Sequence, residues 1–490
     1  MTQFDAHGPR DAVVDFVGDL TRWIAAPDLA ELSRESSVLK AEAAMRGSSD
    51  VRQAMLNRYG ARGPGLAGYA EPGLARVSEE DVRLLASEWF TSGNAALLLD
   101  GPPPAGLALN LPEGPLRSIP AADPCEAQAD LPKMYVTRQG ITTSGVVARS
   151  TAATFLGPAL HKLMHDEFRG RDGAAYAPWS VYEAVDADTA VVFAGSDVSA
   201  PLLSNVVDKT LEIMSRVATS DALSAVVPDL VAQARQANDD PYNALMVAYR
   251  AASDHLRGRE PQSAEAVREE LLVVDADAVR RVAQEMHNTL LLGVDGEAAW
   301  ADQMPRQLMP TRAVAFAGSS YRSRNFPAIR DRLVIGDSGI ALGRRAEWAG
   351  IARNDVEAVM AYPDGAREIV STDGWSVRIE PTLWRRGGVA AREADALVDE
   401  ERRLVAPPRT AEWVPQPMTP INNFRSWVGQ LRWRYELGIA LIVLSMALLF
   451  CAVWWWTGDF PVVGGLIFIG TASGAAISLR RQQPDANSPG

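Results

Sequence analysis

The fold is decided by two matching stretches of sequence, Val82-Arg-Leu-Leu-Ala-Ser-Glu-Trp-Phe90 and Val279-Arg-Arg-Val-Ala-Gln-Glu-Met-His287. Each stretch follows an acidic helix start, and an apolar run comes after it, at residues 95–99 in the first case and 289–292 in the second. Ser78, which stands before the first stretch, fits the capping box that begins many helices. The pattern therefore predicts a helix and then a strand at both places.

The similarity extends toward the N-terminus. Residues 27–35 resemble residues 228–236, and residues 4–24 resemble residues 193–213 more loosely. All three matches share an offset of about 190 to 200 residues, which chance similarity would not produce repeatedly. The chain therefore contains two copies of one α+β pattern.

The second copy begins earlier in this pattern than the first. It adds a strand at 133–137, a long helix at about 151–167 and a pair of strands around 179–193. Their counterparts in the first copy would fall before Met1, so residues 1–100 are expected to form only part of a repeat. A Pro- and Gly-rich linker, 101–130, then leads to the second repeat, 131–305. An incomplete sheet leaves an unpaired edge, so we expect either a partner that covers it or poor solubility of residues 1–100 when they are expressed alone.

One segment of the second copy reads Phe168-Arg-Gly-Arg-Asp-Gly-Ala-Ala-Tyr176. Together with the two-repeat organisation, it resembles the insulinase/pitrilysin superfamily of zinc peptidases over about residues 4–300. The resemblance implies that Arg169 and Tyr176 reach a peptide bound at the first repeat. The residues alone also allow a local role, in which Arg169 pairs with a neighbouring carboxylate and Tyr176 packs under the following strand.

A second feature of the resemblance lies at Glu35 and Glu42, which a helix would place two turns apart on one face. The resemblance implies that Glu42 matches the third zinc ligand of the superfamily, with Glu35 as its neighbour. The other ligands and the general base come from H-x-x-E-H, which this chain lacks. Zinc catalysis needs three protein ligands and a bound water. The chain as written is therefore expected to hold no cofactor and to be no self-sufficient peptidase, with zinc binding only if a partner or an upstream segment supplies that helix.

His161 and His165 form the other candidate metal pair, because an i, i+4 spacing places two imidazoles on one helix face. The motif lacks a Glu between the two histidines. The alternative interpretation is an exposed helix end, where cationic groups are favoured by the helix dipole.

Residues 313–407 change in character. Short apolar runs alternate there with Gly-containing turns, as in Arg332-Leu-Val-Ile-Gly-Asp-Ser-Gly-Ile-Ala-Leu342, and further strands are expected at 356–362, 369–370 and 375–379. A helix from about 388 to 403 would close this small β-rich domain. The pattern resembles the pleckstrin-homology-like barrels of bacterial membrane proteins, and a plain spacer domain is the alternative.

The C-terminal region contains two long uncharged runs within residues 437–480, joined by a short polar connection. Each is about as long as a helix that spans a bilayer, and the flanking arginines favour cytoplasmic chain ends. The sequence thus predicts a juxtamembrane linker at 408–436, a transmembrane hairpin at 437–480 and a polar tail at 481–490. The expected location is the cell membrane, with the bilayer as a partner and both termini in the cytoplasm.

Composition excludes some functions. A net charge of −13 argues against nucleic-acid binding, which needs a basic surface. The leading hypothesis is a catalytically inactive zinc-peptidase homologue that acts as a peptide-binding or assembly subunit. Its alternatives are a zinc metallopeptidase completed by an H-x-x-E-H partner or upstream segment, and a membrane scaffold. A partner subunit, a homo-oligomer and a peptide ligand are all compatible with these hypotheses.

Overall fold

The structure is a computed structural model. It describes residues 2–45, 49–69, 71–125, 130–137, 140–171, 175–240, 243–296, 304–306, 317–326, 328–344 and 347–418. Two compact units are present, Met1–Ser323 with Arg330–Gln416, and Arg324–Ile329 with Pro417–Gly490. In the second unit, the N–H of Phe326 donates to the carbonyl of Met418 over 2.8 Å. All helices and strands named below belong to the first unit.

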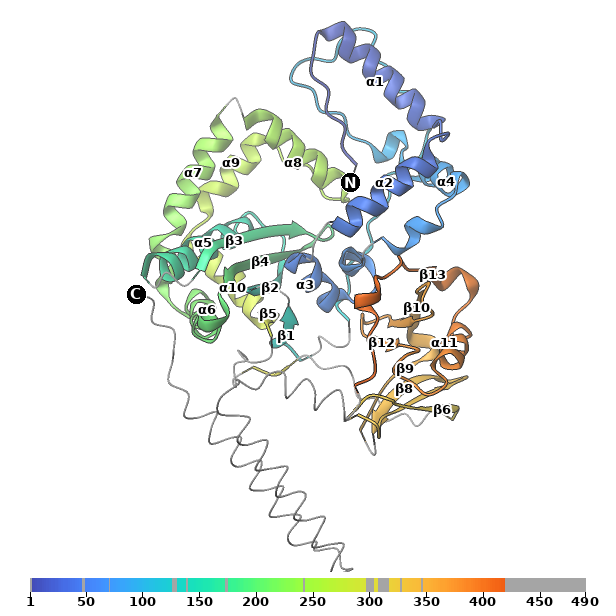
Figure 1. The fold of residues 1–490 in the computed structure, drawn as a ribbon. Helices are drawn as coiled ribbons and strands as arrows, with labels where there is room; N and C mark the ends of the chain where they lie inside the picture. The colour runs from blue at the N-terminus through green and yellow to red at the C-terminus, as the bar shows by residue number, and fades with distance from the viewer. Residues whose placement is uncertain are drawn as a thin grey trace, which may run out of the picture. The chain divides into compact units, whose positions relative to one another are not determined.

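A five-stranded sheet forms the centre of the second repeat (Figure 1). Its order is β1-β5-β2-β4-β3; β1 and β5 are parallel, and the other neighbours are antiparallel. The strands are β1 (Lys133–Thr137), β2 (Ile141–Ala148), β3 (Ala175–Ala184), β4 (Thr189–Val198) and β5 (Leu291–Asp295). Side chains alternate between the two faces of a strand, so Val192 packs into one apolar cluster while Val191 and Phe193 pack into the other. Both faces of this sheet are therefore buried.

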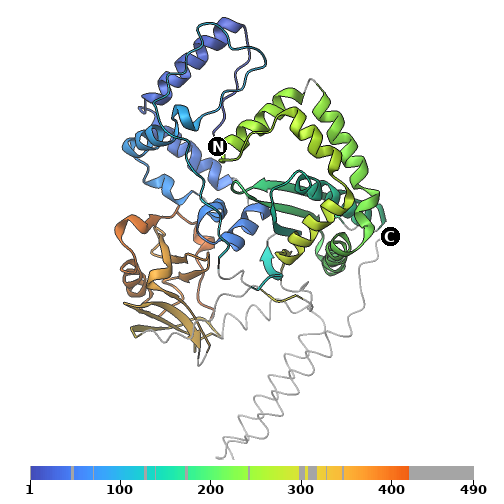
Figure 2. The same ribbon diagram turned by 180° about the vertical axis from the view of Figure 1, so that it is seen from behind.

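Helices cover both faces (Figure 2). The larger cluster joins the sheet to α5, α6 and α10, and the smaller one joins it to α3. The helices of the second repeat are α5 (Ala153–His165), α6 (Leu203–Thr219), α7 (Val227–Asp239), α8 (Ala244–Leu256), α9 (Ala264–Val273) and α10 (Ala276–Asn288). The covering helix α3 comes from the first repeat, so the two repeats share a core.

The first repeat is helical in the described residues 2–125, where no strand is present. Its helices are α1 (Arg10–Ala25), α2 (Leu32–Met45), α3 (Asp50–Tyr59) and α4 (Glu79–Trp89). The capping box at the start of α4 is confirmed, because the Ser78 hydroxyl accepts the Asp81 N–H while the Asp81 carboxylate accepts the Ser78 N–H. The predicted strand at 95–99 is wrong. A strand forms only beside another strand, and none is available in this part of the chain.

The two copies also match in the hydrogen bond of a single buried threonine. Thr210 in α6 is buried and its hydroxyl donates to the carbonyl of Val206 over 2.7 Å. Thr21 occupies the matching position in α1, is also buried, and donates to the carbonyl of Val17 over 2.9 Å. The loosest of the three sequence matches therefore pairs helices with the same local hydrogen bond.

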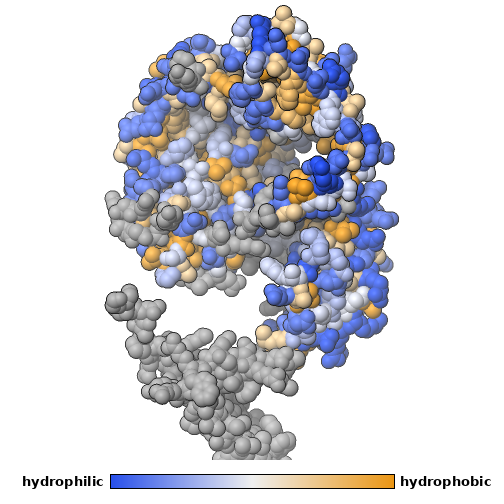
Figure 3. Space-filling model, turned by 45° about the horizontal axis from the view of Figure 1, so that its top comes forward, coloured by the Kyte–Doolittle hydropathy of each residue, from blue (hydrophilic) through white to orange (hydrophobic). Residues whose placement is uncertain are grey.

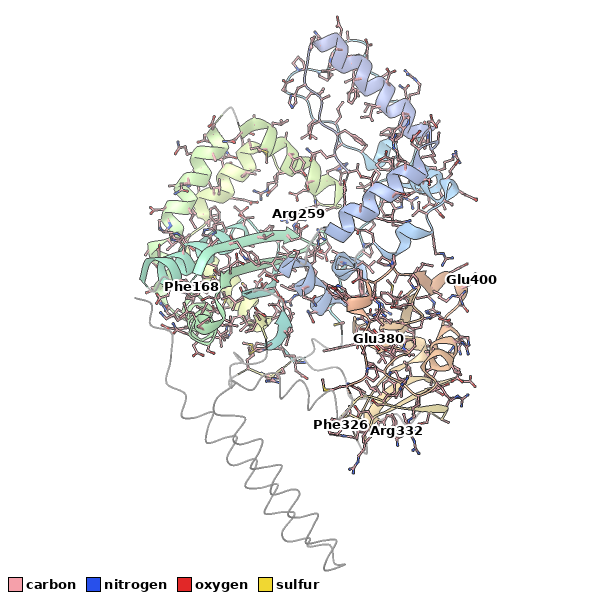
Figure 4. The ribbon with its side chains drawn as sticks, in the orientation of Figure 1. Phe168, Arg259, Phe326, Arg332, Glu380 and Glu400 are labelled. Atoms are coloured by element: carbon pink, nitrogen blue, oxygen red, sulfur yellow. The ribbon has the colours of Figure 1, made fainter. Side chains whose placement is uncertain are left out.

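The β-rich segment contains two four-stranded sheets, β6-β7-β8-β9 and β12-β11-β10-β13, with the helix α11 (Gly387–Asp395). Its strands are β6 (Ser319–Arg322), β7 (Arg332–Gly336), β8 (Gly339–Arg344), β9 (Glu347–Ala352), β10 (Val356–Ala361), β11 (Arg367–Ser371), β12 (Ser376–Ile379) and β13 (Arg403–Val405). The strands predicted from the Gly-containing turns are confirmed. The closing helix is shorter than predicted, and the resemblance to pleckstrin-homology-like barrels stays a prediction. Arg409 joins the segment after β13 to this core, because its guanidinium binds both Asp364 and Glu380, the latter labelled in Figure 4.

The membrane prediction requires correction. Among the described residues, no helix combines the length and apolar character that a bilayer crossing demands. The longest of them, α6, has 17 residues. It is amphipathic, because charged residues such as Asp208, Lys209 and Glu212 lie between its apolar residues. The predicted hairpin at 437–480 lies outside the described residues, as do 419–436 and the tail at 481–490. The two-pass location in the cell membrane is contradicted by this finding and is withdrawn.

Candidate functional site

The segment predicted to contact a peptide lies where α5 gives way to β3. The chain leaves α5 through one wide helical turn, Asp166–Arg171, in the π conformation. Phe168, labelled in Figure 4, is fully buried in the main apolar cluster and fixes this turn to the body of the repeat. The carboxylate of Glu167 adds an ion pair with Lys209 of α6, at 3.5 Å. Single π-helical turns occur frequently at functional sites.

Arg169 lies within this turn, and Tyr176 lies near the start of β3. The structure therefore places the two residues on neighbouring elements, a few residues apart along the chain. Their side chains lie outside the described part of the structure. The peptide contact predicted for them stays a prediction.

β3 itself is an edge strand. It has ten residues and, within the described ranges, pairs only with β4. An edge strand presents N–H and C=O groups along its outer side, and an extended peptide can pair with them. The register of β3 shifts between Ala175 and Pro178, next to the turn that carries Arg169. Such irregularities redirect side chains at the end of a strand.

Glu35 and Glu42 both lie exposed on α2. The Glu35 carboxylate accepts a hydrogen bond from the Arg34 guanidinium, with Nη2 and Oε1 2.8 Å apart. In the described part of the chain, no group of three or more His, Cys, Asp and Glu side chains is arranged to hold a metal ion. One exposed carboxylate does not fit a zinc ion, which needs three protein ligands. The role of Glu42 with an external H-x-x-E-H helix stays a prediction.

His161 and His165 lie on α5, as predicted from their spacing. His161 is exposed, and Nδ1 of the half-exposed His165 lies 3.6 Å from the Asp166 carboxylate. These side chains belong to no three-residue metal group within the described residues either. A metal role for the pair is untested.

Sequence reasoning missed the buried guanidinium of Arg58. This side chain is 1% exposed and donates to the carbonyls of Ser144 and Thr289, at 2.9 and 3.1 Å. Burial lowers its pKa to about 10. The missed signal was the helical spacing, because Arg58 shares a face with the buried Ala54 and Met55. Arg58 therefore links the first repeat to the second through the shared core.

The exposed apolar side of α4 was missed as well. Four residues form what we call the α4 face: Val82, Leu85, Ala86 and Trp89, of which Ala86 is buried and Val82 is half-exposed. Leu85 is 53% exposed and Trp89 is 43% exposed. Apolar residues reach the surface elsewhere in the first repeat too, such as Phe16 and Trp23 on α1. Figure 3 shows apolar residues, in orange, among the hydrophilic ones on the face that it draws. Exposed apolar groups that follow a helical pattern mark a surface for interaction.

Comparison with known proteins gives similarity at the level of structure. No model of a known protein family matches the chain, and no curated protein matches it. The chain is similar to the first half of the periplasmic protease PqqL from Escherichia coli, with 12% identity, 59% of this chain and 70% of that chain covered, and a TM-score of 0.41. The chain is also similar to the periplasmic protease PqqL from the same organism, with 11% identity and a TM-score of 0.42. This match covers 74% of this chain and 45% of that chain. The chain therefore spans less than half of that longer relative.

A third similar structure is the peptidase M16 inactive domain from Pseudomonas fluorescens. Its identity is 12%, with 60% of this chain and 77% of that chain covered and a TM-score of 0.44. M16-like peptidases, an inactive domain included, are thus among the solved structures to which this chain is similar.

Proposed function

We propose that this chain is a catalytically inactive zinc-peptidase homologue that acts as a peptide-binding or assembly subunit. The observation that carries the proposal is the position of β3, an edge strand of ten residues directly after the turn that contains Arg169. An extended peptide would pair with the outer side of β3 through main-chain hydrogen bonds. Arg169 would add a charged contact to a peptide carbonyl or carboxylate, and Tyr176 a contact from the strand itself.

Catalytic inactivity forms part of the proposal. Glu42 is a single exposed carboxylate, and the sequence lacks H-x-x-E-H. A general base and a metal-bound water would both have to come from elsewhere. Zinc-stimulated cleavage of unfolded peptides by the purified chain alone would therefore refute this part of the proposal.

Peptide binding can be tested by fluorescence anisotropy with labelled unstructured peptides. We expect Arg169→Ala to weaken binding about tenfold, because a charge-assisted contact is lost. Tyr176→Phe should weaken it less, because only the hydroxyl is removed. Arg83→Ala is the matched control, since Arg83 is an exposed arginine on α4 that forms an ion pair with Glu79 of the same helix. Equal binding by Arg169→Ala and wild type would contradict the peptide site.

A second candidate function is that of the supporting subunit in a two-chain zinc peptidase. The exposed position of Glu42 on α2 favours it, because a partner's H-x-x-E-H helix could approach that side chain from solvent. Two results would support this function. A protein with H-x-x-E-H should co-purify in fixed ratio, and the two chains together should show zinc-dependent cleavage that is lost in Glu42→Gln. Cleavage unaffected by Glu42→Gln would exclude Glu42 as a ligand.

A further inference from the structure

Three arginines gather around Tyr182, which lies near the C-terminal end of the edge strand β3. Tyr182 is half-buried and packs against the main apolar cluster, so its ring lies on the face of the sheet that α5 covers. Burial raises the pKa of its phenol, whereas the positive charges of Arg149, Arg250 and Arg259 act in the opposite direction. Neighbouring charges shift a pKa in this way, so the three guanidinium groups lie close to one end of β3.

Hydrogen bonds fix Arg149 at this place. Its side chain is only 8% exposed. The guanidinium donates to the carbonyl of Asp186 over 2.9 Å, and it also binds the carboxylate of Asp254, a buried residue in the last turn of α8. Arg149 therefore holds the end of α8 against the turn between β3 and β4.

Arg250 and Arg259, which we call the arginine pair, are both half-buried beside the same end of α8. Arg250 precedes Asp254 by about one helical turn, so the two side chains share a face of the helix. Arg259 follows the helix, and its N–H donates to the carbonyl of Asp254 over 2.9 Å. The chain makes this return at Gly258, whose φ of 77° favours glycine. Arg259, labelled in Figure 4, is therefore held at a fixed place beside α8.

The carboxylates near the arginine pair are bound to other groups or lie on the other face of the sheet. Asp254 binds Arg149, as described above. Glu270 accepts hydrogen bonds from two neighbours, Thr151 and Gln262. Glu183 follows directly in β3, where the alternation of side chains places it on the face opposite to the phenol. The arginine pair thus brings positive charge to the end of β3 beyond what these described carboxylates take up.

We propose that the arginine pair binds a carboxylate of the peptide that pairs with β3. The proposal rests on the peptide-binding role proposed above and names the class of peptide. A peptide residue opposite Tyr182 would place its side chain on the same face of the sheet, with the two Cβ atoms about 5 Å apart. A guanidinium suits a carboxylate there, because its N–H groups can bind both oxygens at once. The carboxylate belongs to an acidic side chain or to the C-terminus of the peptide.

The length of β3 sets the size of this peptide. The turn that contains Arg169 precedes β3, and Tyr182 lies near the other end of the strand. Because a strand rises about 3.3 Å per residue, the chain covers about 20 Å between Tyr176 and Tyr182. A peptide that reaches both the turn and the arginine pair therefore has about seven or more extended residues.

Fluorescence anisotropy of the full chain with three labelled peptides tests the proposal. All three have about ten residues in which apolar and polar residues alternate, as in a strand. The neutral peptide has Gln at its polar positions and an amidated C-terminus. The second has Glu in place of Gln near each end, and the third keeps Gln but has a free C-terminal carboxylate. We expect at least one of these two to bind about tenfold more tightly than the neutral peptide, and the tighter one identifies the source of the carboxylate.

Three variants locate this preference. Arg250→Gln and Arg259→Gln should each remove it, so that the neutral peptide and the carboxylate peptide bind equally well. Arg257→Gln is the matched control, because it removes the same charge from the same end of α8, but the Arg257 guanidinium donates to Ser253. It should keep the tenfold preference. A general loss of structure would weaken the binding of all peptides alike, so a lost preference identifies a contact.

Two outcomes would overturn the proposal. One is equal affinity of the wild-type chain for all three peptides, and the other is a preference that persists in both Arg250→Gln and Arg259→Gln.

The proposed function fails in a different way. If all three peptides bind equally and Arg169→Ala weakens their binding, the β3 site stands and the arginine pair has no part in it. If the preference depends on the arginine pair while Arg169→Ala changes nothing, the arginine pair stands and the contact of Arg169 is wrong. Absence of binding by every peptide would refute both proposals.

Discussion

α10 and α4 are two versions of one helix in different surroundings. Val282 of α10 is buried against the five-stranded sheet, whereas Leu85, at the matching position of α4, is largely exposed. The segment after α10 is the strand β5, and the segment after α4 pairs with no strand in the described residues. The same pattern therefore makes a core in one repeat and a surface in the other. Whether an apolar helix face becomes a core depends on the strands available to it, and its own sequence does not decide this.

The largest expected effect separates the two helices directly. Val282→Asp buries an unpaired carboxylate and should lower the free energy of unfolding by about 4 kcal/mol or more. Leu85→Asp changes an exposed position and should alter it by less than about 0.5 kcal/mol in the isolated chain. Urea denaturation of the full chain measures both. A large loss in Leu85→Asp would mean that α4 is packed in solution.

Arg58 connects the two repeats, so its removal weakens their shared core. Arg58→Ala leaves a cavity and removes the donors to Ser144 and Thr289, and should cost about 3 kcal/mol. Arg58→Met fills the space without a buried charge and should cost about 1 to 2 kcal/mol. The same denaturation experiment gives both values. If the two variants are equally stable, filling the space contributes nothing and the hydrogen bonds carry the whole effect.

Thr21 and Thr210 compare matching hydroxyls in the two copies. Thr21 also accepts the N–H of Asn110 over 3.0 Å, so Thr21→Val should cost about 1 kcal/mol by leaving that donor without its partner. Thr210 donates within its own helix, to the carbonyl of Val206, so Thr210→Val should cost about 0.5 kcal/mol or less. If Thr210→Val costs more free energy of unfolding than Thr21→Val, the hydrogen bond from the Asn110 N–H to Thr21 does not stabilise α1 in solution.

The smallest effect is a dependence on pH. Burial would raise the pKa of Asp186, but hydrogen bonds from Ala122, Thr189 and Asp188 outweigh it and lower the pKa below its ordinary value. A carboxylate with a lowered folded pKa stabilises the protein at neutral pH, and this contribution is lost as the pH falls below about 4. Asp186→Asn should therefore flatten the fall in thermal stability between about pH 5 and 3. An unchanged profile would show that this carboxylate is not linked to folding.

Local signals in the sequence predicted much of the fold. The Ser78 cap, the helices at 82–90 and 279–287, the helix at about 151–167 and the strands around the Gly-containing turns of residues 332–379 all depend on neighbouring residues, and the structure contains them. The predicted strand at 95–99 failed because pairing is not local. Arg58 was missed for a related reason, since a charge can be buried only where the fold supplies carbonyls to receive it.

The candidate site was predictable only in part. The spacing of Arg169 and Tyr176 pointed to the turn after α5 and the start of β3, whereas the edge position of β3 depends on the order of strands in the sheet. The exposed α4 face was hidden for the same reason. The pattern of Leu85 and Trp89 is that of a buried helix, and their exposure follows from the lack of strands in the described residues of the first repeat.

Hydrogen–deuterium exchange of the purified chain tests the central claim most directly. We expect α10 to exchange slowly, because the five-stranded sheet covers it, and α4 and residues 95–99 to exchange quickly. Equal protection of α4 and α10 would contradict the claim that the same helix pattern is covered by a sheet in one copy and not in the other.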